Sequence, residues 1–436
     1  MIDKSFLEFE DTVIEALNGD EGPYKVLLSK FKSPIPKQYV VFLQNTLHAK
    51  LAVDPNDQIA LMLFADWQIC KANNNKNPEI AIEYYNRGIE QNNPKAMYKR
   101  AYMHIKGLGG PVQYNAAITL LERAIELGYI AAIRQRAILH ERGHGGAKNI
   151  DKAIYLYERA IALGDSDAMN RRAMLYKNAA EGKIEDARAI KLLENAIELG
   201  NVDAMCNLAE IYEKGIVVKE DCHKALLLYQ DAHKQGNPKA MYKLAQLYAS
   251  EHDNNKNGKI VIDLYEEAIE RGHGPSMYER AQLYEKSGGA ENIRKAIDLY
   301  TKAINKNQVN ALYRCAVLHR QSGGANINLA IAMYDKAIKQ GNAAAMHDRA
   351  EMHVLGVGDR VDYVRAIELY NLAVKNYYVP SIYNRGKLFE LGIGEKDAIP
   401  NPELAATYFR WARIVSKKNN NEESTKHIYT DMKRLL

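Results

Sequence analysis

The chain has 436 residues, of which 47% are apolar and 26% are charged. A chain of this length is too long for one compact core, so the balance indicates a folded protein made of several domains or of a repeat array. The net charge of +5 comes from interspersed basic and acidic residues, and no basic stripe is concentrated enough to indicate nucleic-acid binding. Every apolar run is far shorter than the roughly 20 residues of a membrane-spanning helix.

The beginning of the chain predicts an N-terminal helical cap over residues 1–37. Helices are expected at 3–18 and 23–32, because GDEGP separates the two stretches and SPIPK then breaks the chain. The first stretch, MIDKSFLEFEDTVIEAL, is acidic and lacks the basic and apolar regions of a secretory signal. A divergent first repeat is expected at 38–72, with a turn at DPND.

From residue 81 onward the segment AIxLYxxAIxxG recurs with a period close to 36 residues. Its first small residue lies at Ala81, Ala117, Ala153, Ala189, Ala225, Val261, Ala296, Ala330, Ala366 and Ala405. A second small residue follows seven positions later in each copy. The helical spacing of the apolar residues predicts that each copy is one short amphipathic helix, here named helix B.

A second motif, AMxxRAxLY, comes before helix B in the same period and predicts a helix A. Its paired small residues are Ala60/Ala65, Ala96/Ala101, Ala132/Ala137, Ala168/Ala173, Ala204/Ala209, Ala240/Ala245, Ser276/Ala281, Ala311/Ala316, Ala345/Ala350 and Ser381/Gly386. Glycine-rich loops, such as GLGG at 107–110 and GHGG at 143–146, follow helix A and suit left-handed helix ends.

One such pair of helices cannot bury its apolar faces alone, so neighbouring pairs must stack on each other. We therefore expect an all-α, right-handed α-solenoid superhelix of about ten helix pairs over residues 38–416. A C-terminal tail is expected at 417–436. This tail is either frayed or a recognition segment, such as a secretion signal.

The segments AMYKRAYMHIKG and NAAITLLERAIELG, with their later copies, resemble Sel1-like repeats, a subclass of tetratricopeptide-type helical hairpins. The match to the pattern ALxxLGxLYxxGxGxxxDxxKAxxxYxxAAxxG covers residues 55 to 415. The resemblance implies a scaffold or adaptor role. Such proteins occur in signalling, in membrane-associated quality control and among the proteins that intracellular bacteria use against their hosts.

One position departs consistently from the family pattern, because arginine replaces the usual leucine before the second small residue of helix A. The arginines are Arg100, Arg136, Arg172, Arg280, Arg349 and Arg385, and each is followed four residues later by an aromatic residue or histidine. This spacing brings a guanidinium close to a ring on one helix face. The series is either a set of packed and paired arginines between helices or a basic stripe for an acidic or phosphorylated ligand.

Helix A lines the concave face in tetratricopeptide-type hairpins, so the resemblance places a candidate partner-binding surface there. The candidate residues are Tyr98, Tyr102, Arg134, Tyr242, Tyr278, Tyr313, His347 and Tyr383. Tyrosine recurs at one position that otherwise varies between repeats, and it suits recognition because its ring offers a large contact area at low entropic cost. The alternative is that these tyrosines pack between repeats.

No catalytic residues, cofactor or metal site are expected from the motifs. The glycine loops recur with the repeat and are therefore turns and not phosphate loops. His140 and His144 are four residues apart, but no third ligand accompanies them. Cys70, Cys206 and Cys222 with one further cysteine do not recur with the repeat, which favours free thiols in a reducing compartment.

These observations together predict a non-enzymatic, monomeric protein-binding scaffold that holds a partner protein in its concave groove. The resemblance extends this to a bacterial effector acting on host proteins, located in the cytoplasm or secreted into a host cell without a Sec signal. Two alternatives remain open at this point. The chain could regulate or inhibit another enzyme of the same organism, or it could bind an anionic lipid or phospho-ligand through the arginine series.

Overall fold

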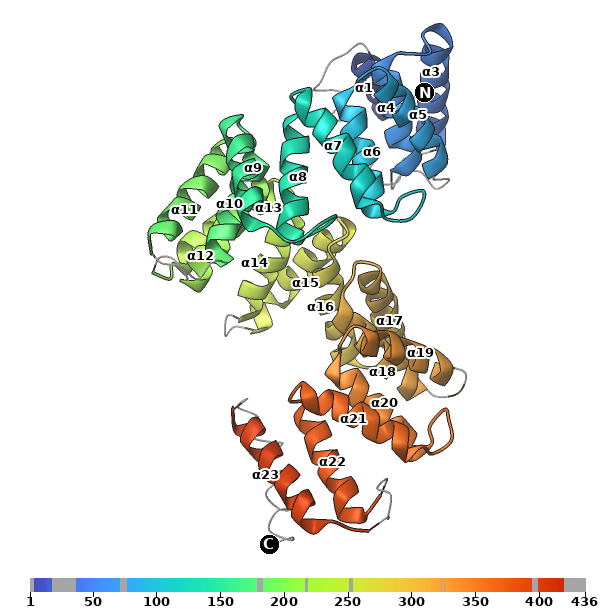
Figure 1. The fold of residues 1–436 in the computed structure, drawn as a ribbon, viewed down its shortest axis with the longest axis vertical. Helices are drawn as coiled ribbons and strands as arrows, with labels where there is room; N and C mark the ends of the chain where they lie inside the picture. The colour runs from blue at the N-terminus through green and yellow to red at the C-terminus, as the bar shows by residue number, and fades with distance from the viewer. Residues whose placement is uncertain are drawn as a thin grey trace. The chain divides into compact units, whose positions relative to one another are not determined.

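The computed structural model describes residues 4–17, 37–70, 77–178, 183–215, 219–250, 254–322, 324, 326–393 and 399–418 (Figure 1). The chain divides into two units, Met1–Leu228 and Tyr229–Leu436. Every regular element in the described ranges is an α-helix, which confirms the all-α prediction. The second cap helix expected at 23–32 and the tail beyond 418 lie outside these ranges. None of the described helices combines the length and apolar character that crossing a membrane requires.

The first unit contains a short N-terminal group of helices followed by regular hairpins. Its helices are α1 (Lys4–Leu17), α3 (Lys37–Val53), α4 (Gln58–Ile69), α5 (Pro78–Glu90), α6 (Pro94–Lys106), α7 (Tyr114–Glu126), α8 (Ile130–Arg142), α9 (Ile150–Ala162), α10 (Ser166–Asn178), α11 (Lys183–Glu198) and α12 (Val202–Lys214). The boundary between the units falls inside α13 (Cys222–Lys234).

The second unit continues the same alternation of helices A and B. Its helices are α14 (Pro238–Ser250), α15 (Asn254–Glu270), α16 (Gly274–Ser287), α17 (Ala290–Ile304), α18 (Val309–Ser322), α19 (Asn326–Lys339), α20 (Ala343–Leu355), α21 (Tyr363–Lys375), α22 (Val379–Leu391) and α23 (Pro402–Lys418). Even-numbered helices from α4 onward are helix A, and the odd-numbered helix after each is its helix B.

Stacking follows the order of the chain. Within each unit, helix A packs most extensively against its own helix B, and that helix B packs against the helix A of the next repeat. The first described helix, α1, packs against α3 and α4 and so covers the start of the array. This nearest-neighbour pattern is what the 36-residue period predicts for a solenoid.

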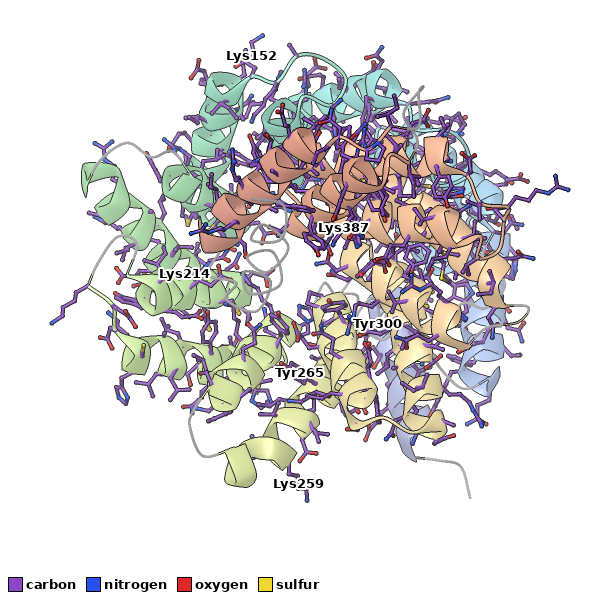
Figure 2. All side chains as sticks on the ribbon, turned by 90° about the horizontal axis from the view of Figure 1, so that it is seen from below. Lys152, Lys214, Lys259, Tyr265, Tyr300 and Lys387 are labelled. Carbon is purple, nitrogen blue, oxygen red and sulfur yellow. The ribbon has the colours of Figure 1, made fainter. Side chains whose placement is uncertain are left out.

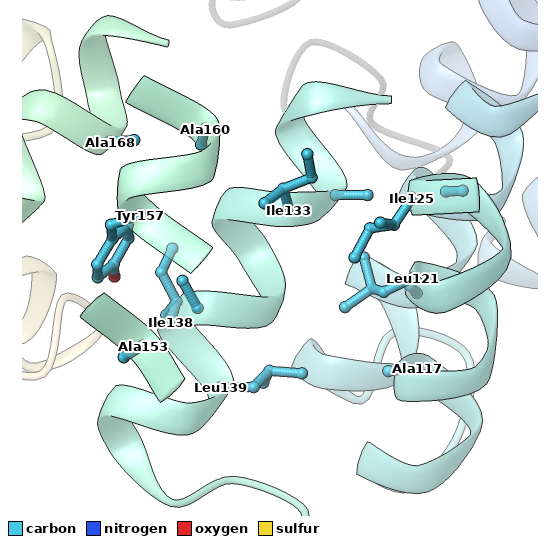
Figure 3. Packing of buried hydrophobic residues seen from close by; sticks show 14 of the residues in the cluster. Ala117, Leu121, Ile125, Ile133, Ile138, Leu139, Ala153, Tyr157, Ala160 and Ala168 are labelled. Carbon is cyan, nitrogen blue, oxygen red and sulfur yellow. The ribbon is translucent and has the colours of Figure 1, made fainter. Parts of the chain in front are cut away.

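Small residues at fixed positions let the helix axes approach closely. Ala117 on α7, Ala137 on α8 and Ala153 on α9 are fully buried, and larger residues such as Leu121 and Ile133 fill the space between the axes (Figure 3). Full burial of one such large apolar side chain contributes about 1.5–3 kcal/mol. The motif positions inferred from the sequence are therefore the packing positions.

The helix ends are fixed by short-range chemistry. Asn93 caps α6, because its Oδ1 accepts hydrogen bonds from the N–H groups of Lys95 and Ala96 at 2.9 and 3.1 Å. Gly143 ends α8 in the left-handed conformation with φ 70°, which a side chain would strain. These ends keep each helix A near 13 residues and so maintain the period.

A recurring polar contact lies inside this packing. The hydroxyl of Tyr300 on α17 donates a 2.7 Å hydrogen bond to Glu285 on α16, and Arg314 on α18 donates to the same carboxylate at 2.8 Å. We call this arrangement of three successive helices the tyrosine clamp. The first part of this arrangement recurs at Tyr157 on α9, whose hydroxyl donates to Glu141 on α8 at 2.6 Å. Figure 2 shows Tyr300 between helices, whereas Lys259 lies at the periphery of its unit.

One helix cap depends on protonation. His273 precedes α16, and its Nδ1 accepts the N–H of Ser276 at 3.3 Å and lies 2.9 Å from the hydroxyl of that serine. Burial, and then the charge of Lys239, lowers the pKa of His273 to about 4. A protonated Nδ1 could not accept these bonds, so the folded chain requires the neutral ring.

This cap should make stability depend on pH. The unfolded chain takes up the His273 proton at about pH 6.5, whereas the folded chain takes it up only at about pH 4. The free energy of unfolding should therefore fall as the pH drops through that window. His273→Asn keeps a cap, as Asn93 does, but does not titrate there. The stability lost between about pH 7 and pH 4.5, measured by urea unfolding, should be about 1–3 kcal/mol smaller in this variant. The exposed His223→Asn serves as control, and an equal effect of both variants would contradict the account.

Candidate functional site

The candidate partner-binding residues do not lie in one environment. Tyr98, Tyr242, Tyr278, Tyr313, Tyr383 and Arg134 are partly buried. Tyr102 is 39% exposed, whereas His347 is only 7% exposed. Tyr98, Tyr102 and Arg134 belong to the first unit and the other five to the second, so the structure does not bring all eight together.

In the second unit the candidate aromatic residues occupy five successive helices A, from α14 to α22. Each ring lies beside the buried ring of its own helix B. The ring centroids are 6.2 Å apart for Tyr242 and Tyr265, 5.7 Å for Tyr278 and Tyr300, 6.2 Å for Tyr313 and Tyr334, 5.5 Å for His347 and Tyr370, and 5.2 Å for Tyr383 and Phe409. We call the five helix A residues the aromatic row. The four tyrosines of this row therefore pack against helix B and also remain partly exposed.

The first-unit candidates are more separate. Tyr98 lies 5.5 Å from the ring of Tyr129, which precedes the next helix A. Arg134 is paired with Asp165 through a 2.7 Å hydrogen bond and with Asp167 at 3.2 Å. A guanidinium held by two carboxylates is less available to a partner than an unpaired one.

The arginine series packs between repeats. Its Nε lies 2.6 Å from Glu122 for Arg136, 2.9 Å from Glu158 for Arg172 and 2.8 Å from Glu266 for Arg280. Each acceptor lies 14 residues earlier, on the helix B of the preceding repeat. In three members of the series the guanidinium also covers the ring four residues later. The distance to the ring centroid is 3.6 Å from Arg172 to Tyr176, 3.8 Å from Arg280 to Tyr284 and 3.8 Å from Arg385 to Phe389.

The last two arginines use related partners. Arg349 donates to Asp359 at 2.6 Å, and Arg385 donates to Asn371 at 3.3 Å. Arg100 is partly buried, and its burial lowers its pKa. These contacts favour the packing interpretation of the series and argue against a basic stripe that is free to hold a phosphorylated ligand.

A polar cluster surrounds one member of the aromatic row, His347 on α20. Its Nδ1 lies 3.0 Å from the Ser381 hydroxyl, and its Nε2 lies 3.4 Å from Glu351 Oε1. Asp348 accepts hydrogen bonds from the hydroxyls of Tyr313 and Tyr334 at 3.2 and 3.3 Å. One nitrogen of His347 and one oxygen each of Asp348 and Glu351 all lie within 4.8 Å of one another.

The pKa values of the two carboxylates in this cluster shift in opposite directions. Burial raises the pKa of Asp348, which is 8% exposed. The hydrogen bond to His347 lowers the pKa of Glu351, whose side chain is 37% exposed. Arg320 on α18 lies 3.9 Å from Glu351. The cluster thus combines a buried and an accessible carboxylate on one helix.

The sequence-based prediction includes His347 and Tyr313 but lacks Asp348 and its second tyrosine donor, Tyr334. A signal was nevertheless present in the aligned repeats. At the position two residues before the second small residue of helix A, the copies from α6 to α22 carry Lys99, Gln135, Arg171, Asn207, Lys243, Glu279, Arg314, Asp348 and Asn384. Only Glu279 and Asp348 are acidic in that set, and both lie in the second unit beside the aromatic row.

Replacing one arginine tests the packing interpretation. Arg280→Ala should lower the free energy of unfolding by about 1–3 kcal/mol, because it removes a buried stem, a ring contact and a charge pair. Most of this loss should persist in about 1 M NaCl, since screening weakens only the pair with the half-exposed Glu266. Lys302→Ala, which breaks an exposed pair with Asp298, is the control and should cost little. A neutral Arg280→Ala would contradict the packing interpretation.

Comparison with known proteins agrees with this architecture. The family model described as Sel1 repeat matches ten consecutive segments, residues 75–93, 94–129, 130–165, 166–201, 202–237, 238–273, 274–308, 309–342, 343–378 and 379–412. No curated protein matches the sequence. The first matched segment contains the helix B α5 alone, and each of the other nine begins with a helix A that is followed by its helix B.

Several solved structures are similar. One is c5321, a protective antigen present in uropathogenic Escherichia coli strains, with a TM-score of 0.55 and 18% identity over 98% of this chain and 91% of that chain. Another is a Sel1 repeat protein from Oxalobacter formigenes, with a TM-score of 0.42 and 24% identity over 49% of this chain and 88% of that chain. The first likeness concerns the fold alone. Because the repeat model spans most of the sequence, the chain belongs to the Sel1 repeat family.

Proposed function

We propose that this chain is a protein-binding scaffold whose second unit holds a segment of a partner protein along the aromatic row. Sel1 repeats form scaffolds that typically mediate protein binding and are generally not catalytic. The proposal adds a surface to that general role. It places recognition on α14, α16 and α18, where Tyr242, Tyr278 and Tyr313 recur at one helical position.

The observation that carries the proposal is the repetition of a half-buried tyrosine with the same polar neighbour. Gln246 donates a 2.8 Å hydrogen bond to the hydroxyl of Tyr242, and Gln282 donates a 3.2 Å bond to that of Tyr278. Each bond holds the tyrosine in place along its own helix. A ring that is fixed before binding loses little entropy when a partner covers it.

A carboxylate lies beside these two tyrosines. Glu279 on α16 is partly buried, which raises its pKa. Burial, and then the charge of Glu279, raises the pKa of Tyr242. No ion pair involves Glu279 among the residues that the structure describes. A lysine, an arginine or a backbone N–H of a partner segment would satisfy this carboxylate, and such a contact favours an extended segment that runs across the repeats.

The proposal covers a partner from the producing organism and one from a host. A role as effector acting on host proteins and a role as inhibitor of a bacterial enzyme both use such a surface, and they differ in the identity of the partner. The arginine series supports neither, because most of its guanidinium groups are already engaged between helices.

Site-specific photocrosslinking tests the surface directly. A benzoyl-phenylalanine residue in place of Tyr242, Tyr278 or Tyr313 keeps an aromatic ring in the row, so the fold should survive. These variants should crosslink one common partner, either when they are expressed in the native cell or when the purified variants are added to a host-cell lysate. The matched control carries the same residue at Tyr155, which is 69% exposed on α9 outside the row.

The captured partner is then used in a binding titration. Tyr242→Ala with Tyr278→Ala should weaken binding at least about tenfold, since central aromatic contacts are often worth more than 1 kcal/mol each. The exposed pair Tyr155→Ala with Tyr363→Ala should bind as the unchanged protein does. Equal crosslinking at Tyr155, or unchanged affinity in the row variant with its helical circular dichroism intact, would overturn the proposal.

A further inference from the structure

The polar cluster on α20 contains three potential metal ligands that lie within five consecutive residues of one helix. Glu351 follows His347 by four residues and Asp348 by three, and these two spacings place side chains beside each other on a helix. Each contributes one ligand atom, and these atoms all lie within 4.8 Å of one another. His347 and Asp348 are buried, whereas Glu351 is partly exposed and offers a route from solvent.

The closest pair has a separation that suits a metal centre. His347 Nε2 and Glu351 Oε1 are 3.4 Å apart. Two ligands of a tetrahedral ion with bonds of about 2.0–2.1 Å are themselves about 3.3–3.4 Å apart. An ion between these two atoms would therefore require little movement of either side chain. Asp348 has a carboxylate oxygen within 4.8 Å of the other two ligand atoms and would turn toward the same point to complete the set.

Neighbouring helices hold the three side chains in place. Ser381 on α22 contacts Nδ1 of His347 at 3.0 Å, which fixes the ring and directs Nε2 toward Glu351. Tyr313 and Tyr334 both donate to Oδ2 of Asp348, which leaves Oδ1 available. Asn384 on α22 lies 3.4 Å from Glu351 Oε1. Outer contacts of this kind orient the ligands in established metal sites.

The charges at this position differ from those of the tyrosine clamp in the preceding repeats. In the tyrosine clamp of α16–α18, Arg314 contacts Glu285 directly at 2.8 Å. In α18–α20 the two charges are exchanged, because Arg320 occupies the position of Glu285 and Asp348 occupies that of Arg314. In this exchanged clamp, Arg320 and Asp348 do not form an ion pair with each other. Within the described part of the chain Asp348 has no ion pair, and Arg320 lies instead 3.9 Å from Glu351.

One guanidinium therefore faces two carboxylates, of which one is buried and hydrogen-bonded by neutral phenols. Burying an unpaired carboxylate is costly, and a cation bound beside it would remove that cost. Arg320 contacts Glu351 only at the limit of an ion pair, and its single charge does not balance the two carboxylates. An ion with two positive charges matches the two carboxylates.

We propose that His347, Asp348 and Glu351 bind a divalent first-row transition-metal ion such as Zn²⁺. One imidazole and two carboxylates form a ligand set suited to these ions, and a set of three leaves at least one coordination position for water or for a partner's side chain. Because the outer contacts come from α18, α19 and α22, the bound ion would tie three consecutive repeats together. The inference goes beyond the scaffold role and does not depend on the proposed partner.

Metal titration of the intact, tag-free protein tests the site. After dialysis against a chelator and then into chelator-free buffer, calorimetric titration with ZnCl₂ should show one saturable site. Zn²⁺ should also raise the melting temperature, because an ion that binds the folded state stabilises it. Glu351→Gln keeps the shape of a partly exposed side chain, and His347→Gln removes the ring nitrogen. Each should weaken Zn²⁺ binding at least about tenfold and remove the thermal shift.

A second histidine–glutamate pair supplies the matched control. His233 lies 3.0 Å from Glu267, without a third ligand in the described structure. His233→Gln should leave both Zn²⁺ affinity and stoichiometry unchanged. Circular dichroism of every variant shows whether the helices remain folded. No saturable binding by the intact protein, or binding that Glu351→Gln and His347→Gln leave unchanged, would overturn the proposal.

Discussion

The structure depends on one constraint, which is that a single helical hairpin cannot bury its apolar faces. Each helix B must cover the helix A of its own repeat and that of the next repeat. Fully buried alanines, such as Ala281 and Ala296, make this possible by letting the axes approach. Stability is then a sum of neighbour interfaces, and positions that take no part in these interfaces are free to vary. That freedom is what separates a scaffold's recognition residues from its packing residues.

Burying polar groups in these interfaces costs free energy, and hydrogen bonds and ion pairs to neighbouring helices offset that cost. In the tyrosine clamp the buried hydroxyl of Tyr300 has a carboxylate partner, Glu285, and that carboxylate has a basic partner, Arg314. The arginine series does the same between helix B and the next helix A. On α20 the exchanged clamp instead leaves Asp348 without an ion pair among the described residues. Functional sites are where such local departures from packing rules are expected, and the metal site that we propose includes this residue.

The sequence alone predicted the helices and their period because one pattern occurs ten times, so errors at single residues average out. It could not decide whether Tyr242 and Tyr278 recognise a partner or pack, since each ring packs against its helix B and yet stays partly exposed. It also missed Asp348. Within one helix that residue is unremarkable in type, and its role depends on Tyr313 and Tyr334, which come from two other helices. Comparison of aligned copies, position by position, shows it as one of two acidic residues, with Glu279.

The central claim is that fixed positions carry stability and the aromatic row carries recognition. A paired mutational scan, in which cellular abundance and partner binding are measured for every substitution, tests it most directly. Changes at Ala281, Ala296 and their equivalents should lower abundance, and binding should fall with it. Changes at Tyr242, Tyr278 and Tyr313 should lower binding well beyond any loss of abundance. Binding-specific effects confined to the outer faces of helices B, with none in the row, would contradict the account.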